Sequence, residues 1–191
     1  MSKPNLHDDI LAAGLEALHS RGFNATSVQD ITEAAGVPKG SFYNHFSSKE
    51  ELGAAVVEQY SLRAAKRRAI LADASIEPLG RIRRHFEALI AAARYPGSPG
   101  CLLGNFGAEL SNQSPAIRER VSTAFEDWTL ALAKVIEEAQ NAGDVKKGVA
   151  AKAIAAFLID AWEGAVLRAK VEQNRAPLEA FVDMTFAKIL V

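Results

Sequence analysis

Residues 26–52 read TSVQDITEAAGVPKGSFYNHFSSKEEL, and this stretch decides how the fold is interpreted. The pattern predicts two short helices on either side of a turn at Gly36, because glycine commonly ends a helix. Phe42 and Phe46 lie one helical turn apart, so we expect both rings on the face that enters the core. Such a pair of helices is typical of a helix-turn-helix motif, and equally of a tight αα-hairpin with a solvated polar face.

If the two phenylalanines anchor the second helix, its polar side chains lie toward the free sides. Its lysine, tyrosine and histidine can then reach phosphates, and its serine, tyrosine and asparagine can approach base edges. The backbone N–H groups at the start of the first helix, and of the helix that begins near Lys49, can also bind phosphate. The candidate DNA contacts are Thr26, Ser27, Lys39, Gly40, Ser41, Tyr43, Asn44, His45 and Lys49.

The composition is that of a globular protein: of 191 residues, 49% are hydrophobic and 24% are charged. The net charge is −1, so any binding of nucleic acid must come from a local patch. The N-terminal sequence MSKPNLHDD lacks the apolar region of a signal peptide, and no apolar run reaches the length of a membrane span. We therefore expect a cytoplasmic protein without a cofactor. Its single cysteine, Cys101, excludes an internal disulfide framework.

Helical spacing recurs along the chain and strict apolar/polar alternation does not, so we predict an all-α fold with about nine helices. Glycines at 22, 36 and 143 are expected to end helices, and prolines at 78, 115 and 177 to start them. Thr26 and Ser48 are the expected caps of the helices that they open. The expected helices are 6–20, 26–35, 38–46, 48–73, one from 78, 101–110, 115–142, 149–173 and one from 177.

The chain from about residue 8 to residue 56 resembles the N-terminal signature of the TetR family of bacterial repressors. The residues that match the family pattern are Gly36, Gly40, Tyr43, Phe46, Lys49 and Glu50, whereas Pro38 stands where a capping Ser or Thr is frequent. The resemblance implies a homodimer on a palindromic DNA operator, with an N-terminal three-helix DNA-binding domain and a C-terminal helical bundle. It divides the chain into a DNA-binding domain, 1–47, and an effector-binding and dimerisation domain, 48–191.

The C-terminal half is similar to the branch of this family that includes electrophile- and oxidant-responsive repressors. The similarity lies in Gly100-Cys-Leu-Leu-Gly104 and in Leu167-Arg-Ala-Lys170, and it implies a sensor thiol at Cys101 with a lysine nearby. A helix N-terminus favours the reactive thiolate, which agrees with that role. The alternative is a small buried hydrophobe, because lone cysteines are more often that, and related proteins bind effectors without covalent chemistry.

Two further sets of residues follow from the helical pattern of this half. Aromatic and polar side chains can line an effector pocket between helices, although aromatics at helical spacing are more often core. The effector and sensor candidates are Cys101, Asn105, Phe106, Phe125, Trp128, Trp162 and Lys170, with Phe86, Glu109, Asp160 and Glu163 as further possible lining.

Small residues in 150–169 and the apolar final helix can form a four-helix dimer interface, or be buried within one chain. Its candidates are Ala153, Phe157, Ala161, Gly164, Phe181 and Phe186.

The sequence therefore predicts a ligand- or electrophile-responsive repressor that is released from its operator by an effector. Three alternatives stay open: an activator or nucleoid-associated protein on the same scaffold, a ligand-binding module with an idle DNA head, and an all-α enzyme. Against an enzyme, the chain has no metal-ligand spacing, phosphate loop or nucleophile motif. Its histidines, His7, His19, His45 and His85, are expected at the surface or at helix ends.

Overall fold

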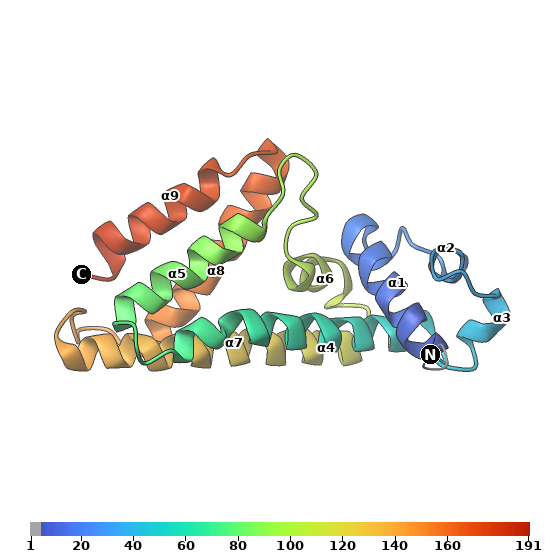
Figure 1. The fold of residues 1–191 in the computed structure, drawn as a ribbon, viewed down its shortest axis with the longest axis horizontal. Coiled ribbons are helices and arrows are strands. Elements are labelled where there is room, and N and C mark those ends of the chain that lie inside the picture. The colour runs from blue at the N-terminus through green and yellow to red at the C-terminus, as the bar shows by residue number, and fades with distance from the viewer. Residues whose placement is uncertain (1–4) are drawn as a thin grey trace. The chain divides into compact units, whose positions relative to one another are not determined.

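The computed structural model describes residues 5–191, and over that range the chain forms nine α-helices joined by turns (Figure 1). The helices are α1 (Leu6–Arg21), α2 (Val28–Ala34), α3 (Lys39–Phe42), α4 (Lys49–Arg67), α5 (Pro78–Ala92), α6 (Leu102–Leu110), α7 (Pro115–Ala142), α8 (Ala151–Glu172) and α9 (Ala176–Met184). A 3₁₀ helix, η1 (Arg68–Ala72), follows α4, and a π-helical turn, η2 (Thr185–Ile189), follows α9. The all-α prediction is confirmed. No helix among these is both long and apolar enough to traverse a bilayer.

The chain packs as two compact units. Unit 1 contains the chain up to Arg63 together with Leu102–Thr123, and unit 2 contains Ala64–Cys101 and Ala124–Val191. The chain passes from one unit to the other within α4, directly before α6, and within α7. This is a division by packing, and the functional division at residues 47 and 48 stays a prediction.

In unit 1, α1 packs against α2, and α2 packs against α3. The side chains of Ile10, Leu18, Ile31 and Phe42 are completely buried where these helices meet. Burying one such side chain stabilises a fold by about 1.5–3 kcal/mol relative to leaving it in water. This small shared core fixes how α3 is presented.

The turn between α2 and α3 depends on Gly36, which has a positive φ of 67°. The N–H of Gly36 donates to the carbonyl of Glu33, and the N–H of Val37 donates to the carbonyl of Thr32 at 3.0 Å. A residue with a Cβ is strained at this φ, even though open space surrounds the position. The predicted role of this glycine in ending the helix is confirmed.

Three predicted helix boundaries are wrong. The first helix of the motif is capped by Ser27 and not by Thr26, because Ser27 and Asp30 form the reciprocal capping box. The second helix, α3, ends at Phe42 and not at Phe46, although the N–H of Phe46 still donates to the carbonyl of Phe42 at 2.9 Å. The fourth helix ends at Arg67, where the chain tightens into η1.

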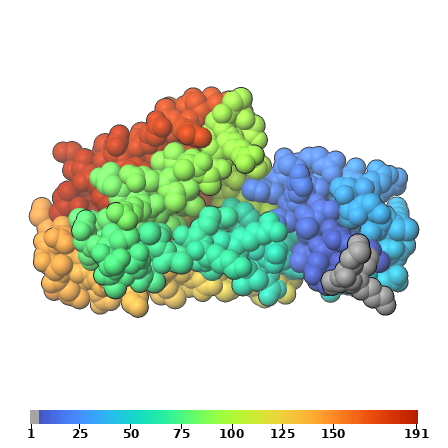
Figure 2. Space-filling view, viewed as in Figure 1, coloured from blue at the N-terminus to red at the C-terminus, as the bar shows by residue number. Residues whose placement is uncertain are grey.

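In unit 2, α9 packs on α8 and on α5, and α5 packs on η1. Figures 1 and 2 show α9 in red beside α5 in green along the surface of this unit. An aromatic cluster of Phe86, Trp162 and Phe181 joins these helices, with ring centroids 4.9–5.4 Å apart. Such tilted and edge-on pairs contribute about 0.5–1.5 kcal/mol each beyond the burial of their area.

Candidate nucleic-acid interface and effector region

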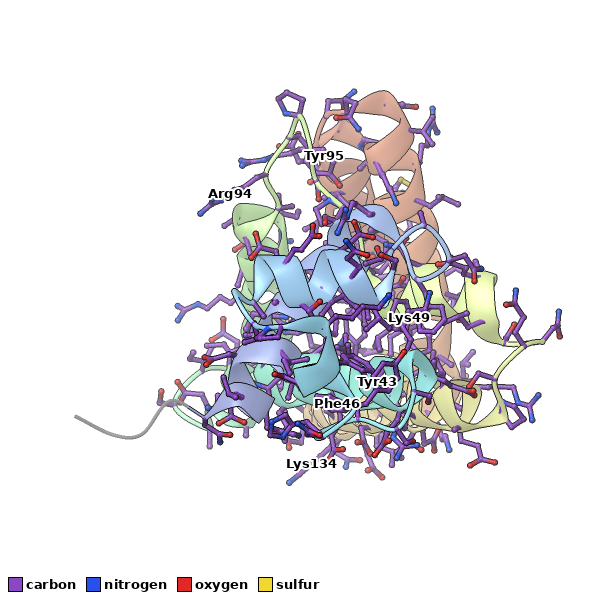
Figure 3. The ribbon with its side chains drawn as sticks, turned by 90° about the vertical axis from the view of Figure 1, so that its right-hand side faces the viewer. Tyr43, Phe46, Lys49, Arg94, Tyr95 and Lys134 are labelled. Carbon is purple, nitrogen blue, oxygen red and sulfur yellow. The ribbon has the colours of Figure 1, made fainter. Side chains whose placement is uncertain are left out.

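The helix α3 presents a polar face to solvent while its apolar face is buried. Phe42 and Phe46 are buried as predicted, whereas Tyr43, which follows the last residue of α3, is 58% exposed. Figure 3 views the molecule from the side that carries α2 and α3 and labels Tyr43 and Phe46. Of the other candidates in residues 39–45, Lys39, Gly40, Asn44 and His45 are exposed and Ser41 is half-buried. Six of the nine candidate DNA contacts therefore lie on or beside one short helix.

Aromatic contacts hold this helix in place. The Phe42 ring lies 5.7 Å from that of Phe46 and 5.2 Å from that of Tyr43. His7 of α1 stacks on Phe46 with centroids 4.9 Å apart and meets His45 edge-on at 6.1 Å. Because rigid positioning limits the entropy lost on binding, a helix held in this way is suited to recognition.

The structure places Thr26 and Ser27 at the start of α2 but engages both within the protein. Thr26 is buried; its hydroxyl donates to the carbonyl of Gly22 at 2.8 Å, and its N–H donates to that of Phe23. The N–H and hydroxyl of Ser27 both donate to the Asp30 carboxylate, at 2.7 and 2.6 Å. These hydrogen bonds lower the pKa of Asp30. The two residues thus shape the loop before α2.

Lys49 is anchored to the same loop. Its Nζ donates to the carbonyls of Phe23 at 3.0 Å and Thr26 at 2.9 Å, and it lies 4.3 Å from the centre of the Phe23 ring. An ammonium group has three N–H donors, so two carbonyl bonds leave one for a phosphate. The positive charge of Lys49 therefore remains at this surface while its side chain holds the loop.

The effector candidates are divided between the two units. Asn105 and Phe106 belong to unit 1, where buried Phe106 packs edge-on against Phe23 at 6.0 Å. The other candidates, Cys101, Phe125, Trp128, Trp162 and Lys170, belong to unit 2, together with Phe86, Asp160 and Glu163. Asp160 is exposed, Phe125 and Lys170 are half-buried, and both tryptophans are buried in the core. The predicted proximity of Lys170 to the cysteine stays a prediction.

Within unit 2, the structure pairs Cys101 with Glu163. The half-buried thiol hydrogen-bonds the Glu163 carboxyl group, whose other oxygen, Oε1, is buried without a partner in the described part of the chain. Burial raises the pKa of Glu163 to about 7, and the hydrogen bond from Cys101 partly opposes that shift. A carboxyl group that titrates near neutrality can exchange a proton with an adjacent thiol.

The candidate dimer residues differ in exposure. Ala153, Phe157 and Gly164 are exposed on α8, Ala161 and Phe186 are half-buried, and Phe181 lies in the aromatic cluster of unit 2. Phe157, at 53% exposed, begins a row of exposed positions on α8 that continues through Gly164, Leu167 and Val171. Exposed apolar side chains in such a row are typical of a surface that another chain covers.

Sequence reasoning missed His85, which is 1% exposed and not a surface residue. Its Nε2 accepts the indole N–H of Trp128 at 3.0 Å, and burial, together with the charges of Arg68 and Arg67, lowers the pKa of His85 to about 4. Periodicity does carry the signal, because His85 falls between Ile82 and Leu89 on the apolar face of α5.

Comparisons with known proteins agree with this architecture. The family model described as "Bacterial regulatory proteins, tetR family" matches residues 10–56, and "Tetracyclin repressor-like, C-terminal domain" matches residues 78–185. The chain is 38% identical over 191 residues to the HTH-type transcriptional repressor DhaR of Mycobacterium sp. (strain GP1), covering 100% of this chain and 95% of that protein.

Two solved structures extend the agreement to the fold. The regulatory protein TetR from Rhodobacter sphaeroides superposes with a TM-score of 0.89 at 33% identity, over 98% of this chain and 100% of that one. The reduced form of Escherichia coli NemR superposes with a TM-score of 0.85 at 25% identity, over 94% of each chain. Since both halves match the family, and the family consists of regulators and not of enzymes, the resemblance is confirmed: the chain belongs to the TetR family of bacterial transcriptional regulators.

Proposed function

We propose that the protein is a homodimeric transcriptional repressor that binds a palindromic operator and is released by an effector. The observation that carries this proposal is the surface of α3 and the turn after it, where Lys39 and Tyr43 are exposed while Phe42 and Phe46 are buried in the core. In a helix-turn-helix protein the second helix enters the major groove, and the first crosses the backbone. The repressor names of relatives such as DhaR support the direction of control.

Binding to two half-sites requires two copies of α3, about 34–36 Å apart for half-sites one DNA turn apart. The row of exposed positions on α8 that begins at Phe157 is the surface that a second copy would cover. Because a two-fold interface pairs the same surface of both copies, a row of small and apolar residues on a single helix fits it well.

Release by an effector requires only a difference in affinity between two arrangements of the dimer. A preference of about 1.4 kcal/mol for the arrangement with the wrong spacing weakens operator binding tenfold. The chain crosses between the units within α4, within α7 and at the start of α6, so three continuous segments can transmit such a change.

A specific observation favours an electrophile as one kind of effector. Cys101 is half-buried, hydrogen-bonds a carboxyl group with a pKa of about 7, and is followed at once by α6. In the first step, the thiol proton passes to the Glu163 carboxylate, and the resulting thiolate attacks the electrophilic carbon to form a C–S bond. For a Michael acceptor, the carbanion or enolate that forms then takes up a proton. The relative NemR, solved in a reduced form, supports this reading.

The proposed function is tested by selecting bound DNA from fragmented genomic DNA at low and high salt. We expect sequence-preferring retention that weakens steeply with salt, because each phosphate contact displaces a counterion. Retention without sequence preference would favour a nucleoid-associated role, and no retention at low salt would leave only a ligand-binding module.

A further inference from the structure

His85 carries a buried N–H group without a hydrogen-bond acceptor. The indole N–H of Trp128 can only donate, so the His85 Nε2 that it contacts at 3.0 Å must be the unprotonated nitrogen. A neutral imidazole with an unprotonated Nε2 carries its proton on Nδ1. The Nδ1 of His85 has no partner among residues 5–191, and His85 is 1% exposed.

Such a group destabilises the fold unless a ligand or water satisfies it. A buried donor left without an acceptor keeps the full cost of having been taken out of water. The His85 ring is also enclosed by aromatic rings, with Phe86 at 5.3 Å and Trp128 at 5.8 Å between centroids. An acceptor that reaches Nδ1 must therefore enter mostly apolar surroundings.

The charges near His85 are mostly positive. The guanidinium groups of Arg68 and Arg67 lie close enough to lower the pKa of His85, and Arg68 is itself half-buried with Asp127 as its acidic neighbour. One helical turn before His85, Arg81 is 5% exposed, and its Nε is also buried with no partner among the residues that the structure describes. Its terminal nitrogens are held by the Leu71 carbonyl and the Glu138 carboxylate.

The unpaired N–H of His85 and the charges around it indicate which kind of ligand could bind there. A ligand must offer a hydrogen-bond acceptor to the His85 N–H, and nearby arginines favour an acceptor that carries negative charge. One N–H among aromatic rings suits a monoanion with an apolar tail better than a phosphate, which needs several donors. Water would satisfy the N–H but would not use the positive charge.

We propose that His85 is the anchor of an effector site for a small organic carboxylate, one oxygen of which accepts the Nδ1–H hydrogen bond. Arg68 and Arg67 supply the positive field, and the Trp128 indole fixes the tautomer that presents the donor. This inference rests on the proposed function and deepens it, because it names the chemical class of a non-covalent effector.

Sodium propionate and sodium benzoate serve as probes, with propionamide and benzamide as uncharged controls of the same shape. The readout is the ¹⁵N–¹H signal of the His85 ring, recognised as the histidine that stays neutral between pH 7 and pH 5.5. We expect a saturable shift of the Nδ1–H signal with at least one carboxylate and at least tenfold weaker binding of its amide. No saturable shift with either carboxylate would overturn the proposal and leave bound water as the partner.

A matched pair of variants separates the two ring nitrogens. In His85→Gln the amide reaches the Nε2 position, so the acceptor for Trp128 is kept and the Nδ1 donor is lost. In His85→Asn the amide lies near the Nδ1 position, so a donor is kept there. We expect at least tenfold weaker carboxylate binding in His85→Gln and a loss of threefold or less in His85→Asn. Equal affinity of wild type and a folded His85→Gln would overturn the assignment.

Operator affinity is measured separately, first without and then with the better carboxylate. We expect the carboxylate to weaken operator binding by the wild type at least fivefold and by His85→Gln less than twofold. If the protein without carboxylate binds no operator, the proposed repressor function is wrong. The ¹⁵N–¹H signal of the His85 ring still tests the carboxylate site in that case. If operator binding is normal and the ring signal does not shift, only the site fails.

Discussion

The carboxylate of Glu109, in α6, accepts the backbone N–H of Phe23 at 2.9 Å, and its second oxygen accepts that of Asn24 at 2.6 Å. These N–H groups belong to the loop between α1 and α2, which also receives the ammonium group of Lys49. Opposite charges from α6 and α4 therefore hold the same loop. Because α6 begins directly after Cys101, a shift at the cysteine can pass along α6 to Glu109 and, through its hydrogen bonds, to the loop before α2.

Replacing Glu109 by Ala should destabilise unit 1. Hydrogen bonds to a charged acceptor contribute about 1.5–3 kcal/mol, and the half-buried position of Glu109 lets water recover part of that, so we expect a loss of about 1–3 kcal/mol. Urea unfolding measures the change. Glu119→Ala, on the exposed surface of α7, is the control and should change stability by less than about 0.5 kcal/mol. Equal effects of both changes would mean that the Glu109 clamp contributes nothing.

Glu163 should make stability depend on pH. Its pKa is about 7 in the folded protein against an ordinary value of 4.5, so the folded state binds more protons between these values. Stability should therefore fall as pH rises from about 4.5 to 7, by at most about 3 kcal/mol. Glu163→Gln removes the titration. As pH rises over that window, the free energy of unfolding of the wild type should therefore fall relative to that of the variant. A constant difference between the two free energies would show that the carboxyl group titrates alike in both states.

Cys101→Ser should keep operator binding and lose any response to electrophiles. The single thiol of the chain makes N-ethylmaleimide a selective probe at neutral pH. In a gel shift, the reagent should release the wild type and leave Cys101→Ser bound. The predicted response to a carboxylate through His85 should persist in the variant. Failure of the reagent to release the wild type would make Cys101 a structural residue.

Gly164→Trp should weaken the dimer without disturbing the fold of one chain. A Cβ added at Gly164 meets no atom within 4 Å, so the bulky ring clashes only with a partner on this surface. Light scattering should show a dimer for wild type and a larger monomer fraction for the variant. Gly148→Trp, at a second exposed glycine with open surroundings, is the control. A Gly164→Trp protein as dimeric as wild type would move the interface elsewhere.

Local signals in the sequence predicted most of the helix boundaries. Gly22, Gly36 and Gly143 follow or lie just beyond the helices that they were expected to end, and each has a positive φ. Pro78 and Pro115 are the first residues of α5 and α7, because proline suits a position whose N–H needs no helical partner. These signals act within a few residues, so they can be read without the tertiary structure.

The errors fall where neighbouring residues compete. Both Thr26 and Ser27 can cap a helix. Ser27 is the cap, because Thr26 is buried and its hydroxyl donates to the carbonyl of Gly22. Pro38 cannot cap α3 with its side chain, and the helix ends at Phe42. The turn that follows, closed by the hydrogen bond from the Phe46 N–H to the Phe42 carbonyl, still brings Phe46 into the core. Such outcomes depend on which side chain the rest of the fold buries.

The groups at the predicted effector sites could be found only in part. Helical spacing predicted which aromatic residues lie in the core. The hydrogen bond between Cys101 and Glu163 joins residues far apart in the sequence, so no local pattern predicts it. The burial of His85 was readable from its place beside Ile82, whereas its bond to Trp128 was not. Tertiary packing decides these partners, so sequence periodicity identifies candidates without joining them.

The central claim is that the exposed side of α3 contacts the operator, and Tyr43 tests it most directly. Leu62, in α4 of the same unit, is 57% exposed against 58% for Tyr43, which makes Leu62→Ala a matched control away from α3. Fluorescence anisotropy with the selected operator gives the dissociation constants of Tyr43→Ala, Leu62→Ala and wild type at one salt concentration. We predict that Tyr43→Ala weakens binding by about fivefold or more, as the loss of about 1–3 kcal/mol at a base or phosphate contact requires, while Leu62→Ala stays within threefold. Equal dissociation constants for Tyr43→Ala and wild type, with both dimeric, would contradict the account.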